Sequence, residues 1–417
     1  MITRRDFVKK GVALVTLGTA YATLPPVFKG AFAIRASEAD AAAPETSPKT
    51  LVIVQLAGGN DGLNTLVPYR DPAYAKLRPS LMVPAGQVVP LNDDFGLHPK
   101  LGALKTLWDS KQLAVVHGVG YPGPNFSHFQ SMLIWQSAGP RAAAGEGWLG
   151  SYLARLESEE HDPLHGFNVD RFVAPELYSS QAPIVSAVDA AEYGFQKLAP
   201  DEAEARRRQT ALLKLYDQFP KNMPYAALLE TTAADAVASS ASLTDAVARH
   251  TPAVAYPQTS IASGLQLVSQ VIASGAKLRV AHVTLGGFDT HSTQLNEHET
   301  LLGELGDALA AFYADLASYG KDKDVLTMTW SEFGRRAEEN ASEGTDHGTA
   351  APMFLLGGSV NGGMYGEPVS LTDLDSGNLK FTTDFRSVYA TVLDRWVGAP
   401  ADDILGEHFD PVAGLVA

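Results

Sequence analysis

The 417-residue chain contains no cysteine. Disulfide bonds, thiolate metal sites and a cysteine nucleophile are therefore excluded. Stability has to come from a hydrophobic core and from any bound metal ion. The composition permits such a core, because 45% of the residues are hydrophobic and 19% are charged, as in an ordinary globular protein.

Basic side chains are scarce relative to acidic ones. The chain has 32 Lys and Arg against 47 Asp and Glu, which gives a formal net charge of −15 at pH 7. A surface this negative argues against a protein that coats nucleic acid or binds polyanions in general. We therefore expect no nucleic-acid partner, whereas a single phosphate or sulfate group could still reach a metal ion.

The chain also lacks an apolar run long enough to span a membrane stably. Its longest candidate, Gly11–Leu24, has only about fourteen residues, and a spanning helix needs about 20. This run follows the twin-arginine pattern Thr3-Arg4-Arg5-Asp6-Phe7 and precedes Ala31-Phe32-Ala33, a small-residue cleavage site. We predict that residues 1–33 are a signal peptide read by the twin-arginine export machinery, which delivers the protein to the periplasm or the exterior. A short N-terminal anchor or a buried helix is the alternative.

The rest of the sequence is organised as one long α/β pattern. Residues 34–49 are rich in Ala, Ser, Glu and Pro and are predicted to form a disordered lead. From residue 50 onward, strand-like and helix-like segments alternate, which is typical of a mainly parallel sheet. Residues 201–257 differ, being charged and amphipathic and then rich in Ala, Ser and Thr. We interpret them as a helical insertion or cap within a single domain over residues 50–417.

Four short apolar runs, typical of buried strands, end or begin next to potential metal ligands. Ligands of α/β proteins bind outside the carboxyl ends of parallel strands, so we expect these side chains to meet. Each alone is more often a capping carboxylate or a surface histidine, but their shared position favours a metal or anion site. The expected ligands of one or two divalent ions (zinc, manganese, calcium or magnesium) are Asp61, Asp289, His291, Glu332, Asp346 and His347.

Ser127 lies where a Pro- and Gly-rich loop gives way to a predicted helix. The free N–H groups at a helix N-terminus favour bound anions, which makes this serine a candidate nucleophile for an anionic substrate. The alternative is that Ser127 only caps the helix.

Several motifs together resemble a known family. In chain order they are Gly58-Gly59-Asn60-Asp61-Gly62, Ser127-His128-Phe129, Gly147-Trp148-Leu149-Gly150, Phe288-Asp289-Thr290-His291, Ser331-Glu332-Phe333-Gly334-Arg335, Thr345-Asp346-His347-Gly348 and Thr383-Asp384-Phe385-Arg386. Over roughly Thr50 to Gly398 the sequence resembles the secreted domain-of-unknown-function family 1501, which looks like a branch of the alkaline phosphatase and sulfatase superfamily. The resemblance implies a three-layer αβα fold with a mainly parallel, alkaline phosphatase-like sheet.

The resemblance also implies roles for individual residues. Asp61 resembles the first metal-binding aspartate of the superfamily, and Ser127 resembles its nucleophile. Asp289 and His291 resemble the Asp/His pair on one metal ion, and Glu332 and His347 resemble further ligands. The implied activity is an exported, metal-dependent hydrolysis of phosphate or sulfate esters, on a small-molecule or polymer substrate.

Two other residues complete the expected catalytic group. His128 or Arg335 is expected to steady the negative charge that develops on the transition-state oxygens. Formylglycine chemistry is not expected, because no cysteine is present and the Pro/Ala-x-Arg that follows the converted residue in sulfatases is missing.

One departure from the superfamily pattern matters. Phe333 stands where a two-metal phosphatase has a histidine, which leaves open a single ion or Asp346 as a substitute ligand. This departure favours the alternative of a secreted binding or assembly protein that keeps the fold without turnover. A phosphate-group mutase fits an exported protein poorly. The glycines Gly58, Gly59 and Gly62 lack the dinucleotide-binding fingerprint, which argues against a dehydrogenase.

Overall fold

The computed structural model describes residues 48–139, 145–190, 193, 201–218, 220, 222–223 and 225–417. The predicted signal peptide and residues 34–47 of the predicted lead lie outside the described residues. Within the described ranges, no helix combines the length and the apolar character needed to cross a bilayer.

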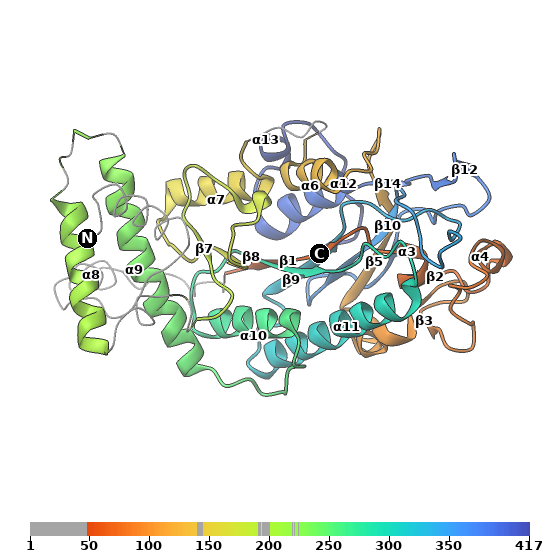
Figure 1. Cartoon of the computed structure of the whole chain (residues 1–417), viewed down its shortest axis with the longest axis horizontal. Coiled ribbons are helices and arrows are strands. Elements are labelled where there is room, and N and C mark those ends of the chain that lie inside the picture. Colours follow the sequence, from red (N-terminus) through yellow and green to blue (C-terminus); the bar gives the residue numbers. More distant parts are fainter. Residues whose placement is uncertain are drawn as a thin grey trace.

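A nine-stranded sheet forms the centre of the molecule (Figure 1). The strands lie in the order β11-β5-β10-β9-β1-β8-β6-β7, and β14 pairs with β5. Every pairing is parallel except those of β10, which is antiparallel to β5 and to β9. The predicted mainly parallel sheet is confirmed. The strands are β1 (Thr50–Ala57), β5 (Leu113–Gly120), β6 (Gly166–Val169), β7 (Ile184–Ser186), β8 (Val280–Gly286), β9 (Val325–Trp330), β10 (Ala351–Leu356), β11 (Gly363–Tyr365) and β14 (Thr383–Asp384).

Helices cover both faces of this sheet, which confirms the three-layer αβα architecture (Figure 1). One face carries the 3-10 helix η1 (Pro99–Leu104), α5 (Lys105–Asp109), α10 (Ser260–Ala273) and α11 (Gln294–Ser318). The other carries α6 (His128–Ser137), α7 (Trp148–Glu159), the 3-10 helix η2 (Pro175–Leu177), α12 (Phe385–Thr391), the π-helical segment η4 (Val392–Val397) and α13 (Ala401–Leu405).

The central strands are buried on both sides. In β1, Val52 and Val54 pack in the cluster under α10 and α11, whereas Leu51 and Ile53 pack in the cluster under α12. Alternate side chains of a strand point to opposite faces, so a strand covered on both faces needs a continuous apolar run. That is why the runs in the sequence predict these strands well.

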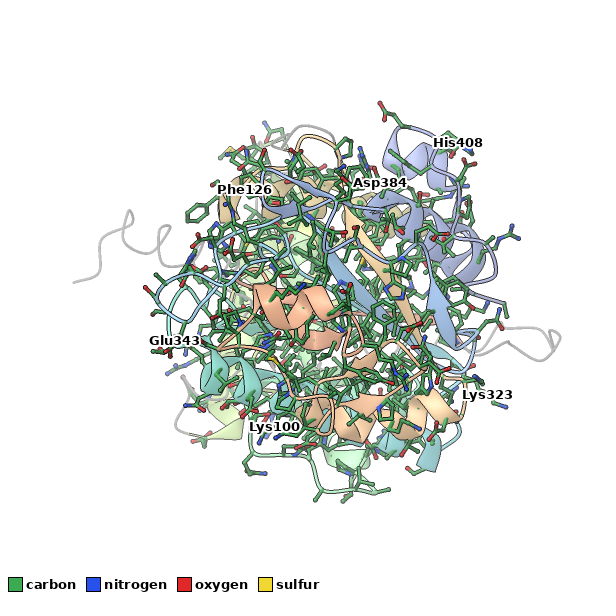
Figure 2. All side chains as sticks on the ribbon, turned by 90° about the vertical axis from the view of Figure 1, so that its right-hand side faces the viewer. Lys100, Phe126, Lys323, Glu343, Asp384 and His408 are labelled. Atoms are coloured by element: carbon green, nitrogen blue, oxygen red, sulfur yellow. The ribbon has the colours of Figure 1, made fainter. Side chains whose placement is uncertain are left out.

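A smaller lobe covers one end of the sheet, at the right of Figure 1, and Figure 2 views the molecule from this end. Its own apolar cluster includes Leu63, Tyr74, Ala350 and Leu379. The lobe consists of α3 (Gly62–Thr65), α4 (Pro72–Leu77), the small sheet of β2 (Leu66–Val67), β3 (Val89–Pro90) and β4 (Gly96–Leu97), and the hairpin of β12 (Leu374–Asp375) and β13 (Asn378–Leu379).

Two long helices, α8 (Glu202–Asp217) and α9 (Ala226–Arg249), lie in the segment interpreted as an insertion. In Figure 1 they lie past the sheet edge formed by β7, at the opposite end from α4. The C-terminal part of α9 joins the main core through Leu243 and Ala246.

The direction of β10 decides where the residues before it lie. The sequence predicts parallel strands. In a parallel sheet, the residues before a strand and the residues after it lie at opposite ends of the strands. Because β10 is antiparallel, Asp346 and His347, which precede it, lie at the same end of the strands as the residues after β1, β8 and β9. β9 and β10 are neighbours joined by loop segments without a crossover helix, and a parallel pair would need such a crossover. The expected convergence therefore depends on a strand reversal that the sequence pattern does not predict.

Candidate metal centre

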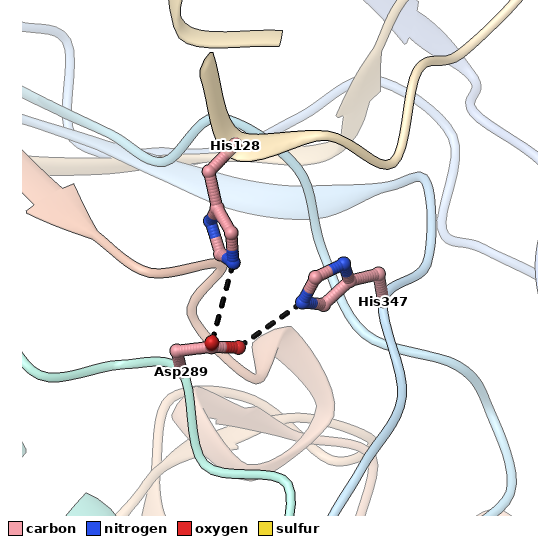
Figure 3. Close-up of side chains that lie close together, drawn as sticks. All are labelled: His128, Asp289 and His347. Atoms are coloured by element: carbon pink, nitrogen blue, oxygen red, sulfur yellow. Dashed lines mark hydrogen bonds and ion pairs between the residues drawn. The ribbon is translucent and has the colours of Figure 1, made fainter. Parts of the chain in front are cut away.

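Three side chains, one from the start of α6 and two from separate loops, converge at this end of the strands. His128, Asp289 and His347 each present a donor atom, and these atoms lie within 4.8 Å of one another (Figure 3). His128 Nε2 is 3.3 Å from Asp289 Oδ2, and His347 Nε2 is 3.1 Å from Asp289 Oδ1. The Asp289 carboxylate thus lies between two imidazole rings.

Each of the two histidine rings is oriented by a hydrogen-bond acceptor that lies next to its Nδ1 atom. His128 Nδ1 lies 2.7 Å from Oε1 of the fully buried Glu332, and His347 Nδ1 lies 2.8 Å from the Phe126 carbonyl oxygen. Nδ1 must carry the proton to donate to these acceptors, so in the neutral ring the lone pair is on Nε2, which faces Asp289. This is the arrangement of a metal-binding histidine, whose other ring nitrogen donates to a carboxylate or a backbone carbonyl.

The environment of His128 Nε2 fits a metal-binding nitrogen. This atom is buried and makes no hydrogen bond among the described residues, although Asp289 Oδ2 is only 3.3 Å away. With the proton on Nδ1, a nitrogen lone pair and a carboxylate oxygen face each other across this gap. A cation between them would turn that repulsion into attraction, so the geometry fits a divalent metal ion.

His291 repeats the pattern at the exposed side of the cluster. Its Nε2 lies 3.0 Å from Asp289 Oδ1 and 2.9 Å from His347 Nε2, and its Nδ1 lies 3.4 Å from Asp346 Oδ1. Two imidazole nitrogens this close need a proton or a cation between them. One carboxylate with two or three imidazoles is a donor set suited to zinc, and also to other first-row divalent ions.

Arg335 holds the loops that carry this donor set. All three nitrogens of its buried guanidinium donate, among others to the carbonyl oxygens of Gly59 and Thr345 and to Asp289 Oδ1 at 2.7 Å. Partial burial acts to raise the pKa of Asp289, but Arg335 and His347 outweigh it and lower the pKa to about 2. Asp289 is therefore ionised at neutral pH. Arg335 was expected to contact the substrate, but its buried guanidinium instead supports the loops and Asp289.

Asp61 is placed differently from the expectation. It is fully buried, with Oδ2 2.6 Å from Arg78 Nη1 and 2.5 Å from Gln294 Nε2, and with Oδ1 3.1 Å from Arg78 Nη2. Burial acts to raise its pKa, but Arg78 and the other donors lower it to about 2. Both oxygens already meet protein donors, so Asp61 forms an internal ion pair outside the group of clustered donors.

Of the six ligands expected from the sequence, the structure therefore brings Asp289, His291 and His347 together. Glu332 and Asp346 orient histidines instead, and both Glu332 oxygens also accept from the Gly58 N–H. His128, expected to stabilise charge, contributes one of the clustered donors.

Ser127 is the N-cap of α6, immediately before His128. Its side chain is exposed and forms no capping hydrogen bond, while its backbone N–H donates to Asn125 Oδ1 at 2.8 Å. The hydroxyl is thus uncommitted at the start of a ten-residue helix. Phe333, where a further ligand was considered, packs its ring 4.9 Å from that of His128 and 4.4 Å from that of His347. It forms an apolar wall that fixes both rings.

One contributor to the site is missed by the sequence. The Phe126 carbonyl has no side-chain signature, although its Pro- and Gly-rich loop indicates carbonyls outside regular structure. The sequence also does not indicate Arg78 and Gln294, the partners that hold Asp61 outside the clustered donors.

The position of Glu332 leads to a test of its role. We expect Glu332→Gln to weaken metal binding by about 10- to 100-fold, the usual effect of losing an outer partner of a ligating histidine. The substitution keeps the volume but removes the charge that fixes the Nδ1 proton of His128. Competition with a chromogenic chelator measures the affinity, and a thermal melt verifies folding. Glu160→Gln, at an exposed glutamate paired with Lys277, is the matched control. Unchanged affinity in a folded Glu332→Gln protein would refute the positioning role.

Comparison with known proteins adds a family and several distant structures. No curated protein matches the chain significantly. The solved structures of similar shape include the C-terminal periplasmic domain of EcEptC from Escherichia coli in complex with Zn, with 10% identity, 75% of this chain and 73% of that chain covered, and a TM-score of 0.37. They also include the PsFucS1 sulfatase from Pseudoalteromonas sp., with 11% identity, 95% and 76% covered, and a TM-score of 0.38. Alkaline phosphatase from the Antarctic bacterium TAB5 has 13% identity, 75% and 93% covered, and a TM-score of 0.31.

The family assignment rests on the sequence itself. Residues 48–404 match the family described as "Protein of unknown function (DUF1501)", which is most of the chain and spans every motif quoted above. The resemblance stated from those motifs is confirmed, and the chain belongs to this family.

Proposed function

We propose that this protein is a metal-dependent hydrolase of phosphate or sulfate esters. The observation that carries the proposal is the convergence of oriented histidine nitrogens on Asp289, with Ser127 directly preceding one of these histidines and its hydroxyl forming no hydrogen bond among the described residues. A bound divalent ion would polarise an ester oxygen and lower the pKa of a nearby hydroxyl. Hydrolysis therefore requires no other cofactor.

The charge of the donor set supports an anionic substrate. Asp289 contributes one negative charge, and the histidines in their metal-binding form contribute none. A divalent ion held there keeps a net positive charge in an otherwise acidic protein. The N–H groups at the start of α6 add to the attraction for one phosphate or sulfate group.

Ser127 is the proposed nucleophile. Its oxygen would bond to the phosphorus or sulfur atom, the bond to the leaving oxygen would break, and the serine proton would end on the departing alcohol. Water would then release phosphate or sulfate and restore the hydroxyl. Export by the twin-arginine machinery, which cell fractionation can test, would place this reaction in the periplasm or outside the cell.

A non-catalytic binding or assembly protein is the alternative, and the buried Phe333 favours it because this residue supplies no ligand for a second ion. Such a protein would bind a metal ion and an anion without turnover.

Replacing Ser127 distinguishes the hydrolase from the non-catalytic binding protein. We expect Ser127→Ala to lower kcat on a nitrophenyl phosphate or sulfate ester by about a thousandfold or more, because it removes the nucleophile. The metal content should not change, because the Ser127 side chain is not one of the clustered donors. Ser151→Ala, on α7, is the control. Metal-loaded wild-type protein that turns over neither ester class would overturn the hydrolase and leave the binding protein.

A further inference from the structure

A cavity of about 270 Å³ lies between the small lobe and the main sheet, at the end of the molecule seen in Figure 2. None of its lining residues belongs to the metal donor group. Most of the lining is apolar and includes Leu63, Leu66, Phe95, Val369, Leu371 and Leu379. The volume is just below the roughly 300–1,000 Å³ of sites for drug-sized ligands, so a smaller molecule fits.

A β-bulge directs one histidine toward this cavity. On β5, His117 and Gly118 together oppose the single residue Pro352 of β10, since Val116 pairs with Met353 and Val119 with Ala351. Proline lacks the N–H that would complete the ladder, and Gly118 has a φ of 57°. Bulges of this kind redirect side chains and are common beside functional sites. His117, Gly118 and Pro352 all line the cavity.

The His117 side chain borders the cavity, and no hydrogen bond to its imidazole is found among the described residues. Its residue is 5% exposed, and its ring lies 4.8 Å from that of Phe95 in a tilted contact. Burial lowers its pKa to about 4, so the ring is neutral at pH 7 and offers one donor and one acceptor. Within the described part of the chain neither ring nitrogen is engaged, so the ring can bond to a polar group of a ligand in the cavity.

The charges around the cavity select the kind of partner. The other ionisable lining residues are the exposed Arg70, Asp71 and Asp94, two acids and one base. No cationic side chain is buried in the lining, so a phosphate, sulfate or carboxylate would lose its hydration without compensation. An uncharged molecule avoids this loss.

We propose that this cavity binds a small, uncharged, single-ring compound of the phenol class. The ring contacts the leucines and Phe95, and the hydroxyl hydrogen-bonds to the His117 imidazole. This ligand site goes beyond the proposed ester hydrolysis and does not depend on it, because it shares no residue with the metal centre.

Titration calorimetry of the mature protein with phenol, benzene and benzoate tests this site. We expect saturable binding of phenol that is about 2- to 10-fold tighter than that of benzene, the effect of one net hydrogen bond. Benzoate should bind more weakly than phenol, because the lining offers its carboxylate no buried cationic side chain. No saturable binding of phenol, or tighter binding of benzoate, would overturn the proposal.

Three variants locate the ligand. His117→Leu should reduce phenol affinity to that of benzene while benzene still binds. Leu371→Trp should fill the cavity and abolish the binding of both, which provides a second test if His117→Leu does not fold. His408→Leu, at an exposed histidine, is the matched control and should bind like the wild type. Phenol binding that survives both cavity variants would place the ligand elsewhere and refute the assignment.

Discussion

Asp289→Asn is expected to reduce metal affinity by about 100-fold or more, because even an outer partner of a ligand contributes about 10- to 100-fold. The substitution preserves shape and one oxygen but removes the only carboxylate among the clustered donors. It also leaves the histidine nitrogens of the cluster without the negative charge that offsets a dication. Ester hydrolysis should fall in parallel, since the proposed reaction requires the bound ion.

Metal content by elemental analysis and affinity by chelator competition measure this effect. Asp403→Asn is the matched control, because Asp403 is exposed and its ion pair with Arg155 is long, at 3.9 Å. A thermal melt separates loss of metal from loss of fold. Asp289→Asn protein that is folded and binds metal as tightly as the wild type would show that Asp289 is not a ligand.

Arg78→Met is expected to destabilise the protein by about 3–5 kcal/mol, the usual effect of breaking a buried ion pair from one side. Both Arg78 and Asp61 side chains are fully buried, with a shortest separation of 2.6 Å. Without the guanidinium, the Asp61 carboxylate would keep, among the described residues, only its hydrogen bond from Gln294. Asp61→Asn combined with Arg78→Met should recover part of the loss, because no charge then remains unpaired.

Chemical denaturation monitored by tryptophan fluorescence measures the free energy of unfolding. Arg155→Met is the control, since an exposed ion pair contributes at most about 1 kcal/mol. The metal affinity of folded Arg78→Met should equal that of the wild type. If Arg78→Met instead released the metal without lowering stability, Asp61 would belong to the metal site, as its position after β1 predicts.

The sequence predicts the framework of the fold because burial on both faces leaves a simple signature. β1, β8 and β9 are short, largely apolar segments, and nearly all of their residues are buried. The direction of β10 is not predictable in the same way. Its apolar character reports burial, while its antiparallel pairing depends on which neighbour it meets.

The candidate site shows a similar division. Asp289 and His347 are predictable because they are polar residues at strand ends. Their partners are not, because the contacts join distant positions: His347 to a carbonyl 221 residues away, and Glu332 to His128 across 204 residues. The role of Asp61 depends on Arg78, whose burial in an ion pair has no local signal. The sequence therefore predicts which residues are available, and the tertiary contacts decide which of them face an ion.

The central claim is that one metal ion binds between His128, Asp289 and His347. A crystal structure of the mature protein grown with zinc, with anomalous diffraction data, tests it most directly. We predict an anomalous peak about 2.0–2.3 Å from the Nε2 atoms of both histidines and from an Asp289 oxygen. Protein saturated with zinc that shows no peak at these three residues would contradict the account.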